Sequence, residues 1–326
     1  MAWLDFGSRP WSSSLRLLHG LADWGRREVG NHCTRDRRNV GRETPLAGWE
    51  GRAWLVLRAS LSKVSHASAS ALALSRRVFM LGTATLAWSA KATAGGPPLP
   101  EPTEMLAPGT RWATPYYALG LGASGPRTVV VAGVHGNERA PPRALRELLQ
   151  SAEALAPGPL LVIPEANRPA LRARSRYAPG TRYADLNRNF PTAKRQHPRG
   201  VLARALWQRI VEFEPQWLLD LHEGWGYRRT SRSMGSSVVL APHPHTKAQT
   251  RSMAARVIRA VDAGIEIPEK RFSLIEPGPK GSLARAVNES LGVPALVFET
   301  TWVEPMSLRI AQQQLMLRTV WQTLRG

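Results

Sequence analysis

The stretch VVVAGVHGNERAPPRAL, residues 129–145, contains a strand pattern, a turn and the start of a helix pattern. Its apolar residues do not alternate with polar ones, which is typical of a strand buried on both faces of a parallel sheet. A glycine-containing turn follows, and the helix pattern begins near Pro141. His135 and Glu138 lie in that turn, past the end of the strand, where open α/β sheets bind their ligands.

From residue 95 onward the chain repeats this alternation of short apolar runs and helix patterns. Strands are expected over residues 128–134, 159–167, 216–224, 236–242 and 294–301. Helices are expected from about residue 141 and over residues 201–213, 246–263, 282–291 and 307–324. The expected fold class is therefore α/β, with a mostly parallel, mixed and twisted sheet and helices on both faces. Residues 169–200 are basic and rich in Pro, Gly and Asn, which predicts loops.

Composition limits the classes of partner and of metal site. The chain has 326 residues, enough for two domains or one large α/β domain, and a formal net charge of +20. No stacked-aromatic or groove-reading motif accompanies the arginines, so no nucleic-acid partner is expected. A partner suggested by charge alone would bind in a salt-sensitive way. The single cysteine is Cys33, so a metal bound beyond residue 94 must be held by His and carboxylate side chains.

Residues 75–94 have the pattern of a twin-arginine export signal. Arg76 and Arg77 precede an apolar run over residues 79–90 that is too short to span a bilayer, and residues 92–94 offer a cleavage site. The alternative is an amphipathic or buried helix. The signal predicts an exported, periplasmic protein of a bacterium, with no stable membrane insertion after cleavage. Residues 1–74 show no sustained period, and we expect a non-native or disordered N-terminal extension there.

Polar side chains also stand at the ends of two later strand patterns. His222 lies in LDLHEG, residues 219–224, and Glu299 lies in VFETT, residues 297–301. Taken singly, Glu138 could merely stabilise a helix N-terminus through the helix dipole, and His222 could be a buried core histidine. Together, two imidazoles and one carboxylate can hold a catalytic zinc ion with an open fourth position. A further carboxylate is then available as a base.

Three blocks carry a family resemblance. They are GVHGNE (133–138), DLNRNFP (185–191) and LDLHEG (219–224), with VFETT (297–301) as a weaker fourth. The chain resembles the zinc carboxypeptidase superfamily from about residue 109 to its last residue. Within that superfamily it resembles the succinylglutamate desuccinylase/aspartoacylase branch and the related murein-peptide amidases. The resemblance implies a zinc carboxypeptidase-like three-layer sandwich and a zinc metallohydrolase domain over residues 95–326.

The resemblance also implies roles for single residues. His135, Glu138 and His222 would bind one Zn²⁺ per chain, and Glu299 would be the general base that takes a proton from zinc-bound water. Asn187 and Arg188 would hold a carboxylate of the substrate. The implied reaction is hydrolysis of an amide bond next to a free carboxylate, in a small-molecule or peptide substrate.

The arginine that stabilises the developing oxyanion is not settled by the motifs. Arg182 precedes a tyrosine shortly before DLNR and is the preferred residue. Arg176 fits the oxyanion role almost as well. If Arg182 has that role, Arg176 is expected to bind the substrate. Asp185 is expected to be structural, organising the turn.

Three other features have alternative interpretations. Glu276 could replace Glu299 as the base, although it precedes a Pro-Gly turn and does not end a strand. His243 and His245 could form a second metal site, but an exposed loop is the favoured interpretation. Residues 224–237, which include Trp225, could form a specificity wall or lid for an anionic substrate, or an ordinary basic loop.

The sequence ends one helix after Glu299, without the extra C-terminal domain of aspartoacylase and desuccinylase enzymes. This predicts a more open cleft and favours a larger substrate, such as a peptide or a cell-wall stem peptide. The first alternative is an N-acyl amino acid deacylase. The alternative from another class is a non-catalytic binding protein for anionic cell-wall fragments. The oligomeric state has no signal in the sequence.

Overall fold

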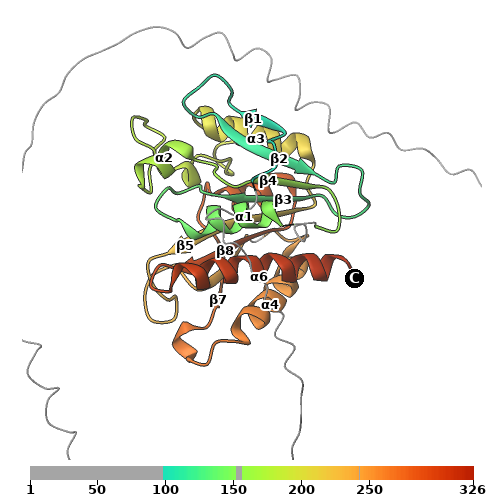
Figure 1. The fold of residues 1–326 in the computed structure, drawn as a ribbon, viewed down its shortest axis with the longest axis vertical. Helices are drawn as coiled ribbons and strands as arrows, with labels where there is room; N and C mark the ends of the chain where they lie inside the picture. Colours follow the sequence, from blue (N-terminus) through green and yellow to red (C-terminus); the bar gives the residue numbers. More distant parts are fainter. Residues whose placement is uncertain (1–97, 152–155, 242) are drawn as a thin grey trace, which may run out of the picture. The chain divides into compact units, whose positions relative to one another are not determined.

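The computed structural model describes residues 98–151, 156–241 and 243–326 (Figure 1). The predicted N-terminal extension and export signal therefore lie outside the described residues. Within them, one mixed sheet of eight strands is covered by helices on both faces. This confirms the expected α/β fold class.

Four parallel strands form the centre of the sheet. They lie in the order β4, β3, β5, β8 and are β3 (Thr128–Ala132), β4 (Leu160–Ile163), β5 (Trp217–Gly224) and β8 (Ala295–Thr301). Every residue of these strands is buried. Burial on both faces explains the continuous apolar runs in β3 and β4 and at the starts of β5 and β8.

Shorter strands complete the two edges. On one side β2 (Thr114–Leu119) runs antiparallel to β4, and β1 (Glu104–Leu106) runs antiparallel to β2. On the other side β6 (Ser237–Leu240) runs antiparallel to β8, and β7 (Ser273–Ile275) runs parallel to β6. The strands β1, β2 and β7 were not predicted. Strands β1 and β7 have three residues each and expose part of their side chains, so they carry no long apolar signal.

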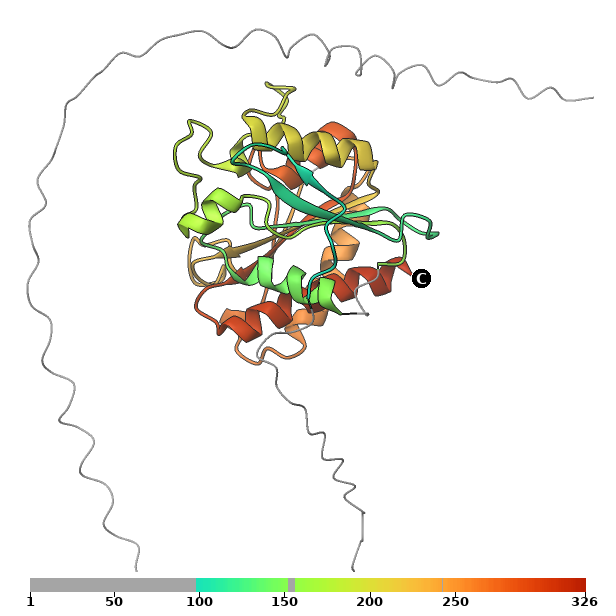
Figure 2. The ribbon, with the colours of Figure 1, turned by 45° about the horizontal axis from the view of Figure 1, so that its top comes forward.

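The helices divide between the two faces, as Figures 1 and 2 show. One face carries α1 (Ala140–Gln150), α4 (Lys247–Asp262) and α6 (Met306–Leu324). The other carries α3 (Val201–Phe213) and α5 (Leu283–Leu291). Each set packs against its own apolar layer of the sheet, which gives the three-layer arrangement implied by the resemblance. No helix in the described part of the chain is long and apolar enough to cross a membrane.

The predicted loop region over residues 169–200 is largely irregular. It contains the end of the short helix α2 (Arg168–Ala173) and the 3-10 turn η1 (Leu186–Arg188). A second 3-10 turn, η2 (Pro268–Lys270), precedes β7. The side chain of Asn167 accepts a hydrogen bond from the backbone N–H of Ala170 and so caps α2.

The alternation of side chains along β5 determines which of its residues point toward the face with the site. Leu219 and Leu221 pack with α1, α4 and α6, whereas Leu218 packs with α3 and α5. Because side chains alternate along a strand, His222 shares the face of Leu218, and Glu223 points to the opposite face. Strand β5 lies on one side of β3, and β4, which follows β3 in sequence, lies on the other. The β3/β5 junction is thus a topological switch point, where α/β sheets form ligand crevices.

Candidate active site

The turn between β3 and α1 presses against α2. A side-chain Cβ at Gly136 would meet the carbonyl group of Ala170 at 2.0 Å, so only glycine allows this approach. Gly133 has a φ of +71°, which also favours glycine. The turn is held further by a hydrogen bond from Gly136 N to the carbonyl oxygen of Ser175. This packing fixes the backbone that carries His135 and Glu138 over the end of β3.

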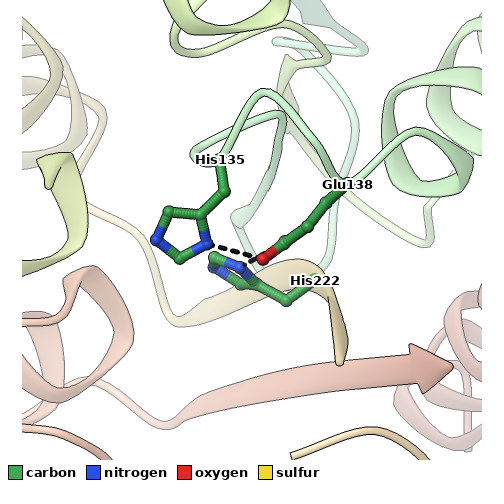
Figure 3. Close-up of side chains that lie close together, drawn as sticks. All are labelled: His135, Glu138 and His222. Atoms are coloured by element: carbon green, nitrogen blue, oxygen red, sulfur yellow. Dashed lines mark hydrogen bonds and ion pairs between the residues drawn. The ribbon is translucent and has the colours of Figure 1, made fainter. Parts of the chain in front are cut away.

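His135, Glu138 and His222 converge in a buried group (Figure 3). Nδ1 of His135 lies 2.6 Å from Oε1 of Glu138, and Nδ1 of His222 lies 2.8 Å from Oε2 of the same carboxylate. Their ligand atoms all lie within 4.8 Å of one another. Two imidazole nitrogens and one carboxylate oxygen are a donor set that fits a zinc ion with an open position. Among the described residues, no other group of three His, Cys, Asp or Glu side chains is close enough to hold a metal.

Carboxylates stand on the outer sides of both imidazoles. Oδ1 of Asp185 lies 3.2 Å from Nε2 of His135, and Oδ2 of Asp220 lies 3.1 Å from Nε2 of His222. Carboxylates in this position orient a metal-binding histidine and strengthen it as a ligand. Asp185 also accepts a hydrogen bond from Asn187 N and so organises the turn, as expected. Its contact with His135, and the whole role of Asp220, were missed in the sequence.

The charges of the group stabilise one another. Burial alone would raise the pKa of Glu138, but the charges and hydrogen bonds of His135 and His222 outweigh it and hold this pKa well below its usual range. Burial opposes protonation of His222, yet Asp220 and Glu138 raise its pKa well above the ordinary value. The pKa of His135 is raised in the same way by Glu138 and Asp185, against the effect of burial.

Glu299 lies on β8 as the register partner of His222 on β5. Register partners on neighbouring parallel strands point to the same face, so Glu299 shares the site's face of the sheet. Only 9% of Glu299 is exposed, and burial raises its pKa to about 8 against the opposing charge of His222. A carboxyl group with a pKa near neutral pH suits proton transfer.

The structure distinguishes between the two arginines. Nη1 of Arg176 lies 3.8 Å from Oε1 of Glu138, and its Nη2 lies 3.5 Å from Oδ2 of Asp185. The guanidinium of Arg182 instead stacks on the ring of Tyr183, 4.9 Å from its centroid, and it forms no ion pair with the described residues. The structure therefore brings Arg176, and not the preferred Arg182, beside the His–Glu–His group.

Asn187 and Arg188 occupy different environments. Asn187 is buried, its Oδ1 accepts a hydrogen bond from Leu283 N at 2.8 Å, and its Nδ2 lies 3.4 Å from Nε2 of His222. Arg188 is exposed, and its Nη1 donates to the carbonyl oxygen of Asn187 at 2.7 Å. The amide of Asn187 is thus engaged by the protein, while Arg188 keeps other guanidinium donors free for an anion.

The alternative residues lie in other contacts. Glu276 forms ion pairs with Lys247 and Arg251. The rings of His243 and His245 lie 5.3 Å apart and are tilted against each other, outside the His–Glu–His group. These contacts give Glu276 a structural role and leave the two histidines as a loop pair.

Residues 224–237 form an anchored loop. The hydroxyl of Tyr227 donates to the carboxylate of Glu304. Arg229 donates to the carbonyl oxygens of Arg271 and Phe272, at 3.1 and 3.3 Å. These contacts hold the loop in one place, which fits a fixed wall better than a closing lid. Trp225, at the start of the loop, is 58% exposed.

A basic hollow of about 260 Å³ adjoins the turn at Gly136. Four arginines and Glu165 contribute to its lining, and the arginines are Arg139, Arg143, Arg146 and Arg174. Of these four arginines only Arg146 pairs with Glu165, at 2.8 Å, and Arg168, outside the lining, lies 3.7 Å from the same carboxylate. The surroundings of the site therefore carry an excess of positive charge, which attracts anionic molecules.

The buried His–Glu–His group lies at the β3/β5 switch point of a mixed α/β sheet, where such folds bind their ligands. The chain belongs to the succinylglutamate desuccinylase/aspartoacylase catalytic domain family, whose model matches residues 124–324. This confirms the resemblance drawn from the sequence blocks. A search of curated proteins finds no match.

Solved structures share the fold. The chain is 18% identical to apo cell shape determinant protein Csd4 from Helicobacter pylori, with a TM-score of 0.54, over 65% of this chain and 54% of that one. Tripeptide-bound Csd4 matches at 17% identity and a TM-score of 0.53, over 65% and 55%. A protein from Shewanella amazonensis, described as a candidate metallopeptidase, matches at 17% identity and a TM-score of 0.53, over 68% and 86%. The chain thus spans about half the length of the Csd4 structures.

Proposed function

We propose that this protein is a zinc-dependent hydrolase that cleaves an amide bond next to a free carboxylate. The observation that carries the proposal is the buried His135–Glu138–His222 group, with Glu299 in register beside His222. A divalent cation held by these three side chains would polarise the scissile carbonyl and lower the pKa of water.

The chain's own residues supply the remaining chemistry. Glu299 takes the proton of the attacking water and passes it to the leaving amine, since it is a buried carboxyl group in register beside His222. Arg176, beside Glu138, donates to the carbonyl oxygen as negative charge develops there. Arg188 binds the free carboxylate of the substrate, and the buried amide of Asn187 holds the backbone from which Arg188 projects.

A peptide is the favoured substrate class. Csd4 is described as a D,L-carboxypeptidase, and structures of it contain a tripeptide or mDAP. The basic hollow beside Gly136 and the exposed Arg188 support a substrate with more than one negative charge. The exposed Trp225 at the fixed loop supports a substrate that extends beyond the scissile amide.

Deacylation of an N-acyl amino acid is the second candidate. It is favoured by the match to the desuccinylase/aspartoacylase family over residues 124–324. The alternative from another class, a binding protein without turnover, is disfavoured because ligand set, acid/base group and arginine are all present.

The proposal includes export. The pattern over residues 75–94 supports a twin-arginine signal, and the absence of cysteine after Cys33 agrees with a protein that needs no disulfide. Intact mass of the native protein tests this point. A first residue near position 95 in a periplasmic fraction is expected, and a native chain that retains residues 1–74 would contradict it.

One experiment tests the proposed activity. The purified chain is analysed for bound metal and assayed for amine release from acyl amino acids and stem peptides, beside Glu299→Gln. About one zinc per chain, with turnover lost in the variant while the metal stays, would support the hydrolase. Stoichiometric zinc without turnover on any substrate would favour the binding protein, and a chain that binds no divalent metal would overturn the site.

A further inference from the structure

Two side chains of α6 contact the strands of the site from the opposite face of the sheet. Nη1 of Arg309 donates to Oε1 of Glu223 at 2.6 Å. One helical turn later, Nε2 of Gln313 donates to the carbonyl oxygen of His222 at 2.9 Å. Neither side chain reaches the face of the sheet that carries the His–Glu–His group, yet Gln313 holds the backbone of one member of that group, and Arg309 holds the residue next to it.

Glu223 connects three elements. Its side chain is 0% exposed, and its Oε2 accepts a hydrogen bond from the backbone N–H of Ala140, the first residue of α1, at 2.9 Å. The backbone N–H of Glu223 donates to Oε2 of Glu138 at 3.1 Å. Glu223 therefore holds the carboxylate of Glu138 through its backbone N–H. Through its own side chain it holds the start of α1, the helix that follows Glu138.

Arg309 keeps the Glu223 carboxylate in this place. A buried carboxylate is unfavourable without a counter-charge, and the guanidinium of Arg309, 12% exposed, is the cation that contacts it. Without Arg309 the carboxylate would lose its counter-charge, and its hold on the backbone N–H of Ala140 would weaken. The turn that carries Glu138 would then lose its fixed end.

Gln313 bridges the two strands at the level of the site. Besides the His222 carbonyl on β5, its Nε2 lies 3.4 Å from the carbonyl oxygen of Phe298 and 3.2 Å from Oγ1 of Thr300 on β8. Phe298 and Thr300 flank Glu299. One amide group therefore fixes the strands at the register pair of His222 and Glu299.

We infer that Arg309 and Gln313 are positioning residues, through which α6 sets the relative positions of Glu138, His222 and Glu299. This inference rests on the proposed metal site. Its consequence is that metal affinity depends on two side chains of a helix that covers the opposite face of the sheet from the His–Glu–His group.

Metal affinity tests the inference in the full chain. Arg309→Met and Gln313→Met are compared with Arg318→Met, an exposed arginine of the same helix, by zinc competition with a chromophoric chelator and by the visible spectrum of the Co²⁺ form. Loss of an outer-shell contact typically weakens metal binding by about 10- to 100-fold. We expect a loss in that range for both variants, an altered Co²⁺ spectrum, and less than about a twofold change for Arg318→Met.

Arg309→Lys keeps the charge and one donor, so it should retain most of the affinity. If Arg309→Met does not fold, Gln313→Met and Arg309→Lys are compared with Arg318→Met in its place. Affinities and Co²⁺ spectra in Gln313→Met equal to those of Arg318→Met would overturn the inference.

Amide exchange in the metal-free chain separates this inference from the proposed function. In Arg309→Met, the amides of Ala140 and Glu223 should both exchange at least about 10-fold faster than in Arg318→Met. In Gln313→Met, the same increase is expected for the amide of Glu223. A native chain that binds no metal would end the proposed function, and unchanged exchange at both amides would separately overturn the positioning role.

Discussion

Glu299 and His222 are register partners on the adjacent parallel strands β8 and β5, so a carboxyl group with a pKa of about 8 and an imidazole share one face of the sheet. No loop conformation intervenes between them, since both belong to buried strands. The spacing of the two backbone positions is therefore set by the hydrogen bonding of the sheet itself and not by a loop.

Removing the acid/base group should abolish turnover without removing the metal. Positioned proton transfer contributes about 10²- to 10⁴-fold to a rate, so Glu299→Gln should lower kcat by that amount. Because Glu299 is outside the His–Glu–His group, zinc content should be unchanged. Steady-state kinetics and metal analysis on one sample check both points. A variant with native kcat would assign the proton transfer to another residue.

Glu299 should also make the metal-free chain less stable as the pH rises. The pKa of this carboxyl is about 4.5 in its ordinary state and about 8 in the fold. Between these values the folded chain holds a proton that the unfolded chain has released, so the free energy of unfolding falls, by at most about 1.4 kcal/mol per pH unit for one proton.

Denaturant unfolding of the metal-free chain between pH 4.5 and 8 measures this slope. Glu299→Gln has no such carboxyl, so the difference between the two chains isolates its contribution from the titrating histidines. Parallel slopes for the native chain and the variant would show that the pKa of Glu299 is not raised by the fold.

The two outer carboxylates should control metal affinity. Asp185→Asn and Asp220→Asn keep the shape of each side chain but remove the charge beside His135 and His222. We expect each to weaken zinc binding by about 10- to 100-fold. Chelator competition measures this, with Glu212→Gln on the exposed surface of α3 as the control. Affinities equal to that of the control would deny both carboxylates an orienting role.

Kinetics of single variants should show whether Arg176 or Arg182 stabilises the oxyanion. Arg176→Gln should lower kcat/KM by about 10²- to 10³-fold, mainly through kcat, because the lost donor acts on charge that develops in the transition state. Arg182→Gln is the matched control, because its guanidinium stacks on Tyr183, and it should change kcat/KM by less than about threefold. The reverse outcome would restore the preference drawn from the motifs.

The sequence indicated the centre of the fold well and its edges poorly. Strands β3, β4, β5 and β8 were predictable because parallel strands buried on both faces are continuous apolar runs. Strand β7 was missed because three partly exposed residues carry no such signal. The polar residues at strand ends were also predictable, because two imidazoles and a carboxylate together fit a metal site, although each alone also fits a structural role.

Asp220 was predictable but was missed: it stands two positions before His222, so a strand's period of two places both on one face. Residues that act across the sheet were not predictable. Glu223 gave no comparable signal, since its partners Ala140 and Arg309 lie 83 and 86 residues away. The choice between Arg176 and Arg182 depended on the path of a long irregular loop, which local sequence does not determine.

The alternation of His222 and Glu223 has a practical consequence for redesign. Chemistry lies on one side of β5, and the ties to α1 and α6 lie on the other. Loops that border the site can thus be exchanged to seek new specificities while the ties to α1 and α6 stay untouched. A library confined to residues 177–184 and 225–232, which leaves Arg176 in place, should retain metal binding in most members, because in the described part of the chain none of these positions forms the hydrogen bonds that tie Glu223, Arg309 and Gln313 together.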